Sequence, residues 1–272
     1  MIYFGAKGRL IGVKCPSVQR DTDGERYQFT TTLEGKRKAQ VLPGDHRRVW
    51  DLGLGNVTTP DQFAVLRDIA RGAWGRGPFV FVPADAPNTN MLAPGVASCD
   101  PAAGLSPVNE PAGPMLTPDG WAPRSLARVD PPGYVHFGGD GITGASPVLP
   151  KQTVTASAYV EGEGAAAQVA WWDAEGRYLS ATTSSVTAPA GLAVVRSHVT
   201  ATAPVGAVWA SVRAVNAVRG TRPALSWTDQ LVPFADGRLA QKVVVDQVSS
   251  DLVHTLPGRT YQSLSFTVTE VG

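Results

Sequence analysis

The side chains of this sequence that are able to carry out chemistry are few and show no recognised spacing. The four histidines lack the HxxH and HExxH patterns that place two imidazoles on one metal ion; they are His46, His136, His198 and His254. No serine stands in the G-x-S-x-G elbow that presents a nucleophile. Asp140, among four residues from Gly138 to Gly141, lacks the repeated Asp or Asn of a calcium loop and is better interpreted as part of a turn. We therefore expect no catalytic residue, no metal and no cofactor, and predict that the protein is not an enzyme.

Two neighbouring tryptophans supply the best candidate for a binding side chain. Successive residues of a strand point to opposite faces, so if Trp171 joins Val169 in a core, Trp172 lies on the outer face. An exposed indole stacks well on the apolar face of a sugar ring. The alternative is that a loop or a neighbouring subunit covers Trp172. Trp121 and Tyr134, in the loop-rich stretch that precedes the pair, are candidates for the same carbohydrate site, and the same alternative stays open for them.

The composition favours many short strands joined by turns. Only 17% of the 272 residues are charged, while 29 glycines and 22 prolines supply turns. The net charge of +1 gives the chain as a whole no reason to bind nucleic acid or an anionic membrane. No apolar run approaches the ~20 residues of a membrane span, and no signal peptide opens the chain, which predicts a cytoplasmic, soluble product. Cys15 and Cys99 have no CxxC spacing, and the sequence leaves open whether they pair.

The stretch from Arg47 to Val82 predicts a strand, a helix and a second strand. Thr59 is the expected helix cap, Pro60 the first helical residue and Gln62 the residue that reaches back to the cap. Apolar residues at three- and four-residue spacing predict one buried stripe; they are Phe63, Leu66, Ile69, Ala70 and Ala73. Gly75 is expected to end the helix. The helix therefore has one apolar face to bury on a sheet.

The rest of the chain predicts an inserted sandwich. Residues 152–232 contain strands at intervals of about ten residues with turns between them, which is typical of a β-sandwich. Residues 83–150 are rich in Pro and Gly, and we expect a long irregular segment or an extended connection there. The last strands, within residues 236–272, are too few to bury a core alone. We expect them to return to the N-terminal sheet, which makes the sandwich an insertion.

Part of the middle of the chain resembles a carbohydrate-binding module of the jelly-roll type. The resemblance covers about half of the chain and lies in the pattern of these segments: Tyr134–Phe137, Ser146–Pro150, Thr153–Val160, Trp171–Leu179 and Thr202–Ala207. It implies a β-sandwich with a glycan ligand, and it assigns no individual binding residue, because the sugar-contacting aromatics of that family vary in position.

The flanks are similar to minor tail proteins of actinobacterial phages, of the distal-tail type. The matching segments are Arg47–Leu52, Thr59–Trp74, Gly77–Phe81 and Tyr261–Glu270. The resemblance implies a structural protein that forms a ring at the tail tip, six-fold by analogy, next to the tail tube and the tail-tip hub. Proteins of this type commonly place the extra domain after the hub domain, whereas here we expect it inside.

Taken together, these features predict a mostly β protein. A tail-hub domain with one helix, residues 1–88 plus 234–272, would be interrupted by an inserted jelly-roll β-sandwich, residues 89–233. The expected function is that of a phage tail-tip component of the virion, assembled in the host cytoplasm, which forms a ring and displays the sandwich toward host cell-surface glycan. The alternative is a stand-alone carbohydrate-binding or glycan-hydrolase accessory module. A third hypothesis is a sandwich that binds no sugar and only spaces the tail.

Overall fold

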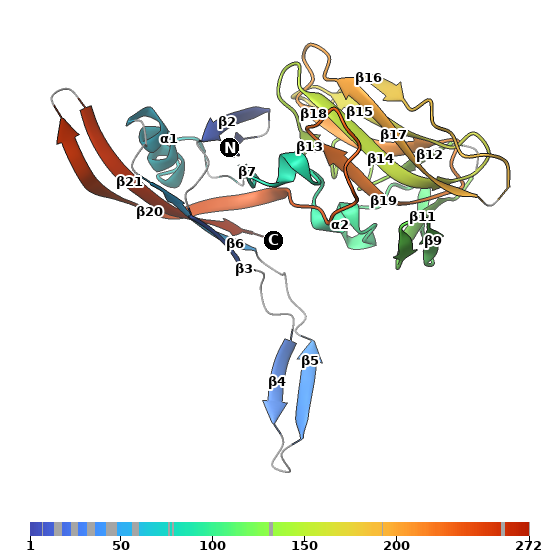
Figure 1. Cartoon of the computed structure of the whole chain (residues 1–272), viewed down its shortest axis with the longest axis horizontal. Helices are drawn as coiled ribbons and strands as arrows, with labels where there is room; N and C mark the ends of the chain where they lie inside the picture. Colours follow the sequence, from blue (N-terminus) through green and yellow to red (C-terminus); the bar gives the residue numbers. More distant parts are fainter. Residues whose placement is uncertain are drawn as a thin grey trace. The chain divides into compact units, whose positions relative to one another are not determined.

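The computed structural model describes residues 1–6, 8–13, 18–22, 27–31, 36–41, 48–55, 60–75, 77, 79–130, 133–191, 193–256 and 259–271. The chain divides into two compact units (Figure 1). The first contains Met1–Ala6, Ile11–Phe81 and Ala240–Gly272, and the second contains Lys7–Leu10 and Val82–Leu239. Strands dominate both units, and the described residues include two α-helices, so the predicted mostly β fold class is confirmed.

The first unit is built on a seven-stranded sheet of the described strands. Its order is β2 (Arg9–Val13), β1 (Ile2–Ala6), β7 (Phe79–Val82), β20 (Ala240–Leu256), β21 (Arg259–Glu270), β6 (Val49–Leu54) and β3 (Val18–Thr22). β21 pairs with β6 from Leu264↔Leu54 to Thr269↔Val49, and β20 pairs with β7. The predicted return of the C-terminal strands to the N-terminal sheet is therefore confirmed. β4 (Tyr27–Thr31) and β5 (Arg37–Val41) form a separate two-stranded sheet.

One face of the seven-stranded sheet is buried because apolar side chains alternate along β6 and β21. The buried residues on these two strands are Trp50, Leu52, Leu54, Leu264, Phe266 and Val268. Aromatic rings also meet across this face: the ring of Trp50, on β6, lies 5.0 Å from that of Phe81, on β7. Arg48 covers the Trp50 ring at 5.0 Å and donates two hydrogen bonds to Glu270, at 2.9 and 3.0 Å. These contacts anchor the last strand to the core.

Helix α1 (Pro60–Ala70) contacts β20. Leu66 and Ile69 are buried, whereas Ala70 and Ala73 are exposed, so the buried stripe is narrower than predicted. The helix ends at Ala70, earlier than Gly75, because Gly72 adopts a positive φ of 78° and its amide bonds back to the Ile69 carbonyl. The predicted cap Thr59, and the side chains of Gln62 and Phe63, lie outside the described residues.

The second unit is a sandwich of two antiparallel sheets. One has the order β17 (Val194–Thr202), β14 (Thr153–Glu161), β19 (Arg219–Ser226), β11 (Ser125–Arg128) and β8 (Asn109–Ala112). The other has the order β12 (Tyr134–His136), β18 (Trp209–Val215), β15 (Ala166–Trp172) and β16 (Tyr178–Thr183), with β13 (Ser146–Pro147) also paired to β18. Side chains alternate along these strands, and the inner ones contact the facing sheet: Val154, Ala156, Val160, Val169, Trp171, Val212 and Leu225.

The stretch 83–150 is not the irregular connection that we expected. It supplies β8, β11 and β12 to the two sheets, the hairpin of β9 (Met115–Thr117) and β10 (Gly120–Ala122), and the short helix α2 (Pro94–Ala97). These strands are three or four residues long and stand among prolines, so the periodicity in the sequence is too short to reveal them.

Asn90 joins the beginning of the sandwich to its end. Its side chain is fully buried and donates hydrogen bonds to the carbonyls of Pro223, at 3.3 Å, and Ala235, at 2.9 Å. Its oxygen accepts from the amides of Leu92, at 3.1 Å, and Leu225, at 3.2 Å. The clamp satisfies the whole side-chain amide and holds the entry and exit segments side by side, as the closure of an inserted domain requires.

Candidate functional site

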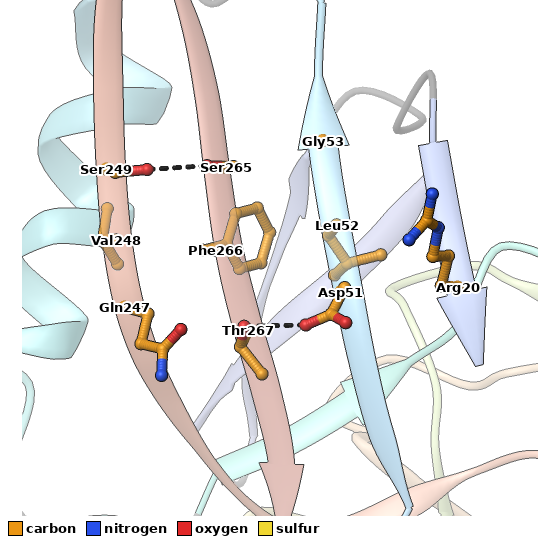
Figure 2. Close-up of a pocket in the computed structure, with 10 residues that line it drawn as sticks. All are labelled: Arg20, Asp51, Leu52, Gly53, Gln247, Val248, Ser249, Ser265, Phe266 and Thr267. Carbon is orange, nitrogen blue, oxygen red and sulfur yellow. Dashed lines mark hydrogen bonds between the residues drawn. The ribbon is translucent and has the colours of Figure 1, made fainter. Parts of the chain in front are cut away.

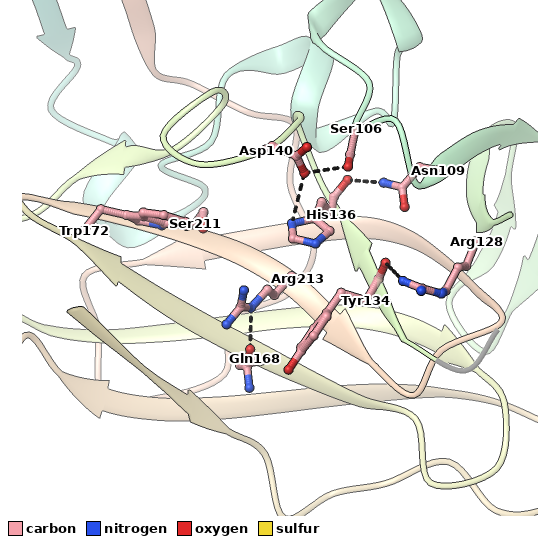
Figure 3. A network of polar contacts seen from close by, with 10 residues as sticks. All are labelled: Ser106, Asn109, Arg128, Tyr134, His136, Asp140, Gln168, Trp172, Ser211 and Arg213. Carbon is pink, nitrogen blue, oxygen red and sulfur yellow. Dashed lines mark hydrogen bonds and ion pairs between the residues drawn. The ribbon is translucent and has the colours of Figure 1, made fainter. Parts of the chain in front are cut away.

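The outer face of the sheet β12–β18–β15–β16 carries aromatic and polar side chains that contact one another. The register sets His136, Arg213, Gln168 and Thr183 opposite one another across the four strands. Side chains at directly paired positions share a face, so this row points away from the core. We call the set the Arg213 face; its members are Tyr134, His136, Gln168, Trp172, Tyr178, Ser211 and Arg213. Figure 3 shows these residues except Tyr178.

Arg213 lies at the centre of this face. Its guanidinium carbon is 4.6 Å from the centre of the Tyr134 ring, on β12, and 5.5 Å from that of Tyr178, on β16. Its Nε donates to Gln168, whose own amide donates to Thr183 Oγ1 at 2.6 Å. Gln168 is almost fully buried, so the chain of bonds holds the arginine in one place. The rings come from opposite edges of the sheet and meet the arginine between them.

Trp172 and Tyr178 form the second half of the face. The rings meet edge to face at 5.5 Å, and the Trp172 indole donates to Ser211 Oγ at 2.9 Å. Trp172 is half-buried, whereas 51% of Tyr178 and 42% of Tyr134 are exposed. Trp171, its neighbour in sequence, lies in the core as predicted. The two tyrosines and the partly open indole present apolar ring surface to solvent beside a cation.

A turn holds the polar end of the face. Asp140 accepts a hydrogen bond from Ser106 at 2.5 Å and lies 3.8 Å from His136 Nδ1. Burial lowers the pKa of His136, and the positive charges of Arg213 and Arg128 lower it further, while Asp140 acts in the opposite direction. Because its pKa is lowered, His136 is a neutral polar group near pH 7. The turn itself requires glycine at Gly138, because the φ there is +86° and a Cβ would lie 2.8 Å from Val96.

The structure brings two of the three predicted site residues together and leaves the third elsewhere. Tyr134 and Trp172 share the Arg213 face. Trp121, which is 60% exposed, lies on β10, in the hairpin that covers the other sheet. In that hairpin Asp119 accepts a hydrogen bond from Tyr159 of β14, and the Trp121 carbonyl accepts one from Arg222 of β19 at 2.8 Å. The carbohydrate-binding role of all three residues stays a prediction.

Sequence reasoning missed Arg213, Tyr178 and Gln168. Arg213 had a visible signal, since it interrupts the alternation of small apolar residues in Trp209–Val215 and must therefore face outward. Tyr178 follows the turn after Trp172, and its position is set by an irregularity in the register between Trp171 and Trp172. Nothing in the sequence indicates that β12 and β15 flank the same strand.

The first unit has a polar hollow on the other face of its sheet. It has a volume of about 560 Å³ and is open to solvent; its lining includes Arg20, Asp51, Gln247, Ser249, Ser265 and Thr267 (Figure 2). Thr267 donates to Asp51 at 2.9 Å, and the hydroxyls of Ser249 and Ser265 lie 2.6 Å apart. Small side chains on adjacent strands leave the space, and no histidine, cysteine or second carboxylate is among its described lining residues. The hollow suits contact with another surface better than acid–base chemistry.

Other reactive groups lie apart from both surfaces. Cys99 is a buried free thiol, and its burial raises its pKa to about 12. Its predicted partner candidate, Cys15, lies outside the described residues. Within the described ranges, no three His, Cys, Asp or Glu side chains gather closely enough to hold a metal ion. A search of the same residues for a long apolar helix able to cross a membrane found none.

In comparisons with known proteins, no family model and no curated protein matches the chain. Among solved structures, the enzymatically active domain of tailspike protein 4 of bacteriophage CBA120 is similar to this chain with a TM-score of 0.30 and 10% sequence identity. The match covers 43% of this chain and 17% of that one.

Proposed function

We propose that the protein is a non-enzymatic structural component of a phage tail tip, of the distal-tail type, which displays a glycan-binding sandwich. The first unit would form a ring with other copies and contact neighbouring tail proteins. The second unit would bind glycan on the host cell surface. The resemblance of the flanks to minor tail proteins supports the assembly part, and the Arg213 face carries the binding part.

The single observation behind the binding role is the exposure of two tyrosines and a tryptophan on one face of a sandwich sheet. Aromatic rings are rarely left open to water without reason, and sugar rings stack on them through their C–H faces. Gln168 and Arg213 add fixed polar groups between the rings. A few rings with convergent polar groups on a rigid sheet are what weak, selective glycan binding requires. Many copies in a ring would turn weak contacts into firm attachment.

The hairpin of β20 and β21 supports the assembly role. Residues Asp251–Leu256 of β20 pair with β21 beyond the part of β21 that pairs with β6. Among the described strands, none pairs with the other edge of β20 past Val243. Leu252 and Val253 on this projecting segment are 65% and 47% exposed. Open strand edges with exposed apolar residues are normally covered by a neighbouring subunit in an assembly.

Light scattering coupled to gel filtration tests the assembly role. The full chain at high concentration should elute as a closed oligomer, and the double variant Leu252→Lys/Val253→Lys should shift it toward monomer. The substitution Val205→Lys, at a residue that is 93% exposed in the second unit, is the matched control and should change nothing. A wild-type chain that stays strictly monomeric at every concentration would contradict the proposed ring assembly.

A glycan array tests the binding role. The wild-type chain should bind at least one class of glycan, and Tyr134→Ala, Tyr178→Ala and Trp172→Ala should each weaken that binding. If the wild-type chain binds no glycan, the sandwich is a spacer and not a binding domain; if all three variants bind as the wild type does, the Arg213 face is not the binding site.

A stand-alone carbohydrate-binding or accessory module is the second candidate. The observation in its favour is that every residue of the Arg213 face belongs to the second unit. A strictly monomeric chain that binds a glycan with micromolar or better affinity would favour this function over the tail-tip role, because a module that acts alone gains nothing from avidity.

A further inference from the structure

The terminal amino groups of Arg213 make it different from most arginines of the sandwich. Five others pair with carboxylates: Arg124 with Asp100, Arg177 with Asp173, Arg196 with Asp119, Arg219 with Glu161 and Arg238 with Asp85. Arg213 donates through Nε to Gln168 and lies against two tyrosine rings. Among the described residues no acceptor takes its two terminal amino groups.

The surroundings do not neutralise this charge. Asp140, the carboxylate at the end of the face, is engaged by Ser106 and faces His136. His136 and the nearby Arg128, which donates to the carbonyls of Asp130 and Tyr134, bring no negative charge. A half-buried guanidinium is costly to keep without an acceptor, because it has lost part of its hydration. The site is therefore complementary to an anion that arrives from outside.

We propose that the Arg213 face binds an acidic glycan, with a carboxylate or phosphate group of the sugar on the terminal amino groups of Arg213. This inference rests on the proposed glycan-binding function and names its ligand class. A planar guanidinium with two adjacent N–H donors matches a carboxylate or phosphate in a two-point contact. Tyr134 and Tyr178 flank the guanidinium, so a sugar ring that carries the acidic group can stack on one of them while the charge is met between them.

Gln168 prepares the arginine for this contact. It is almost fully buried, accepts from the Arg213 Nε and is itself fixed by its bond to Thr183. Because the arginine is already ordered, little side-chain entropy is lost when the anion binds. The network also fixes which edge of the guanidinium is free.

The test uses the full chain on an array of matched pairs. One arm contains oligosaccharides of uronic acids and their carboxyl-reduced forms, and the other contains phosphorylated oligosaccharides and their dephosphorylated forms. We expect one acidic arm to bind about 10- to 100-fold more tightly than its neutral counterpart, the loss expected for a hydrogen-bonded charged partner. The arm that binds distinguishes carboxylate from phosphate. Raising the salt concentration should weaken only the acidic members.

Variants locate the effect at the arginine. Arg213→Gln should remove the preference for the acidic member of each pair, and Arg213→Lys should keep part of it, because the charge stays and the two-point geometry is lost. The control is Arg222→Gln, since Arg222 is also half-buried over an aromatic ring, Phe234, but belongs to the other sheet. It should keep the preference of the wild type. Unchanged melting of Arg213→Gln shows that the fold survives.

The outcomes separate the two proposals. If neutral glycans bind as tightly as their acidic counterparts and Tyr134→Ala weakens both, the acidic ligand class is wrong while the glycan-binding function stands. If the wild-type chain binds no member of either arm, both proposals fall. A preference for acidic members that persists in Arg213→Gln would also overturn the assignment to this residue.

Discussion

The two outer faces of the sandwich carry the same pair of side chains and use it differently. On one, Arg196 lies 5.7 Å from the ring of Tyr159; on the other, Arg213 lies 4.6 Å from the ring of Tyr134. The hairpin of β9 and β10 covers the first pair, and Tyr159 is fully buried. Tyr134 is open to solvent. An arginine over a tyrosine ring is therefore not in itself a sign of a binding site. The pair is available to a ligand only where no other part of the chain covers it.

The two faces also differ in whether their polar groups find hydrogen-bond partners within the chain. Arg196 donates to the Val232 carbonyl at 2.6 Å and to Ser157 at 3.3 Å, and Asp119 lies 4.0 Å away. The Tyr159 hydroxyl donates to Asp119, and burial together with that bond raises the pKa of Tyr159 to about 12. The covered face is thus satisfied from within the chain. The open face leaves donors for something else, and the comparison predicts that stability and binding are separable.

The largest expected effect is on the covered face. Tyr159→Ala should lower the free energy of unfolding by about 3–5 kcal/mol, because it removes a fully buried ring and leaves Asp119 without its donor. Tyr134→Ala, the matched change on the open face, should cost less than about 1 kcal/mol. The measurement is urea unfolding followed by labelling of Cys99, which is buried and reacts when the second unit opens, in a Cys15→Ser background. Equal losses in the two variants would erase the distinction between the faces.

The arginines give the next contrast. Arg196→Ala should cost about 1–3 kcal/mol of stability, because the partly buried acceptors that it serves lose their donor, and should leave glycan binding unchanged. Arg213→Ala should do the reverse, with a loss of binding and a change in stability below about 1 kcal/mol. Thermal melting and titration calorimetry on the same preparations decide. A large loss of stability in Arg213→Ala would mean that the open face is structural too.

A smaller effect separates the two predicted tryptophans. Trp172→Ala should weaken glycan binding by about tenfold, the size expected for one stacked ring. Trp121→Ala should leave binding unchanged, although Trp121 is the more exposed of the two, because it lies on the hairpin over the other sheet. Binding lost in Trp121→Ala alone would move the site to the covered side.

Local pattern predicted the faces of individual strands, and strand order decided which residues share a face. Alternation placed Trp171 inside and Trp172 outside. It did not place Tyr134 beside Arg213, because the paired residues of β12 and β18 are about 80 positions apart in sequence, and pairing over such a distance leaves no periodic signal. In the first unit, too, no local pattern indicated that β21 pairs with β6. That pairing was predicted because the last strands are too few to bury a core alone.

The sequence did not show which polar side chains find a partner within the chain. Five arginines of the sandwich pair with a carboxylate and Arg213 does not, yet nothing in the sequence around these arginines indicates the difference. Asp119 satisfies Tyr159 only because a short hairpin folds over β14, and that hairpin was hidden in a stretch that we expected to be irregular. The candidate site thus depends on the tertiary structure. The alternation of side chains along each strand predicts only which residues face outward.

The smallest expected effect concerns acid. Burial lowers the pKa of His136 below its usual 6.5, so the unfolded state takes up a proton first as the pH falls. The stability of the second unit should therefore fall as the pH drops from about 6.5 to the folded-state pKa, and this contribution should not change further below that value. His136→Gln, which keeps a neutral polar group, should remove that part of the slope. Melting temperatures measured from pH 7.5 to 5.0 report it, with the wild type and the variant converging above pH 7. A variant that keeps the full acid slope would show that His136 is no better protected than a surface histidine, and that this end of the face is open to water.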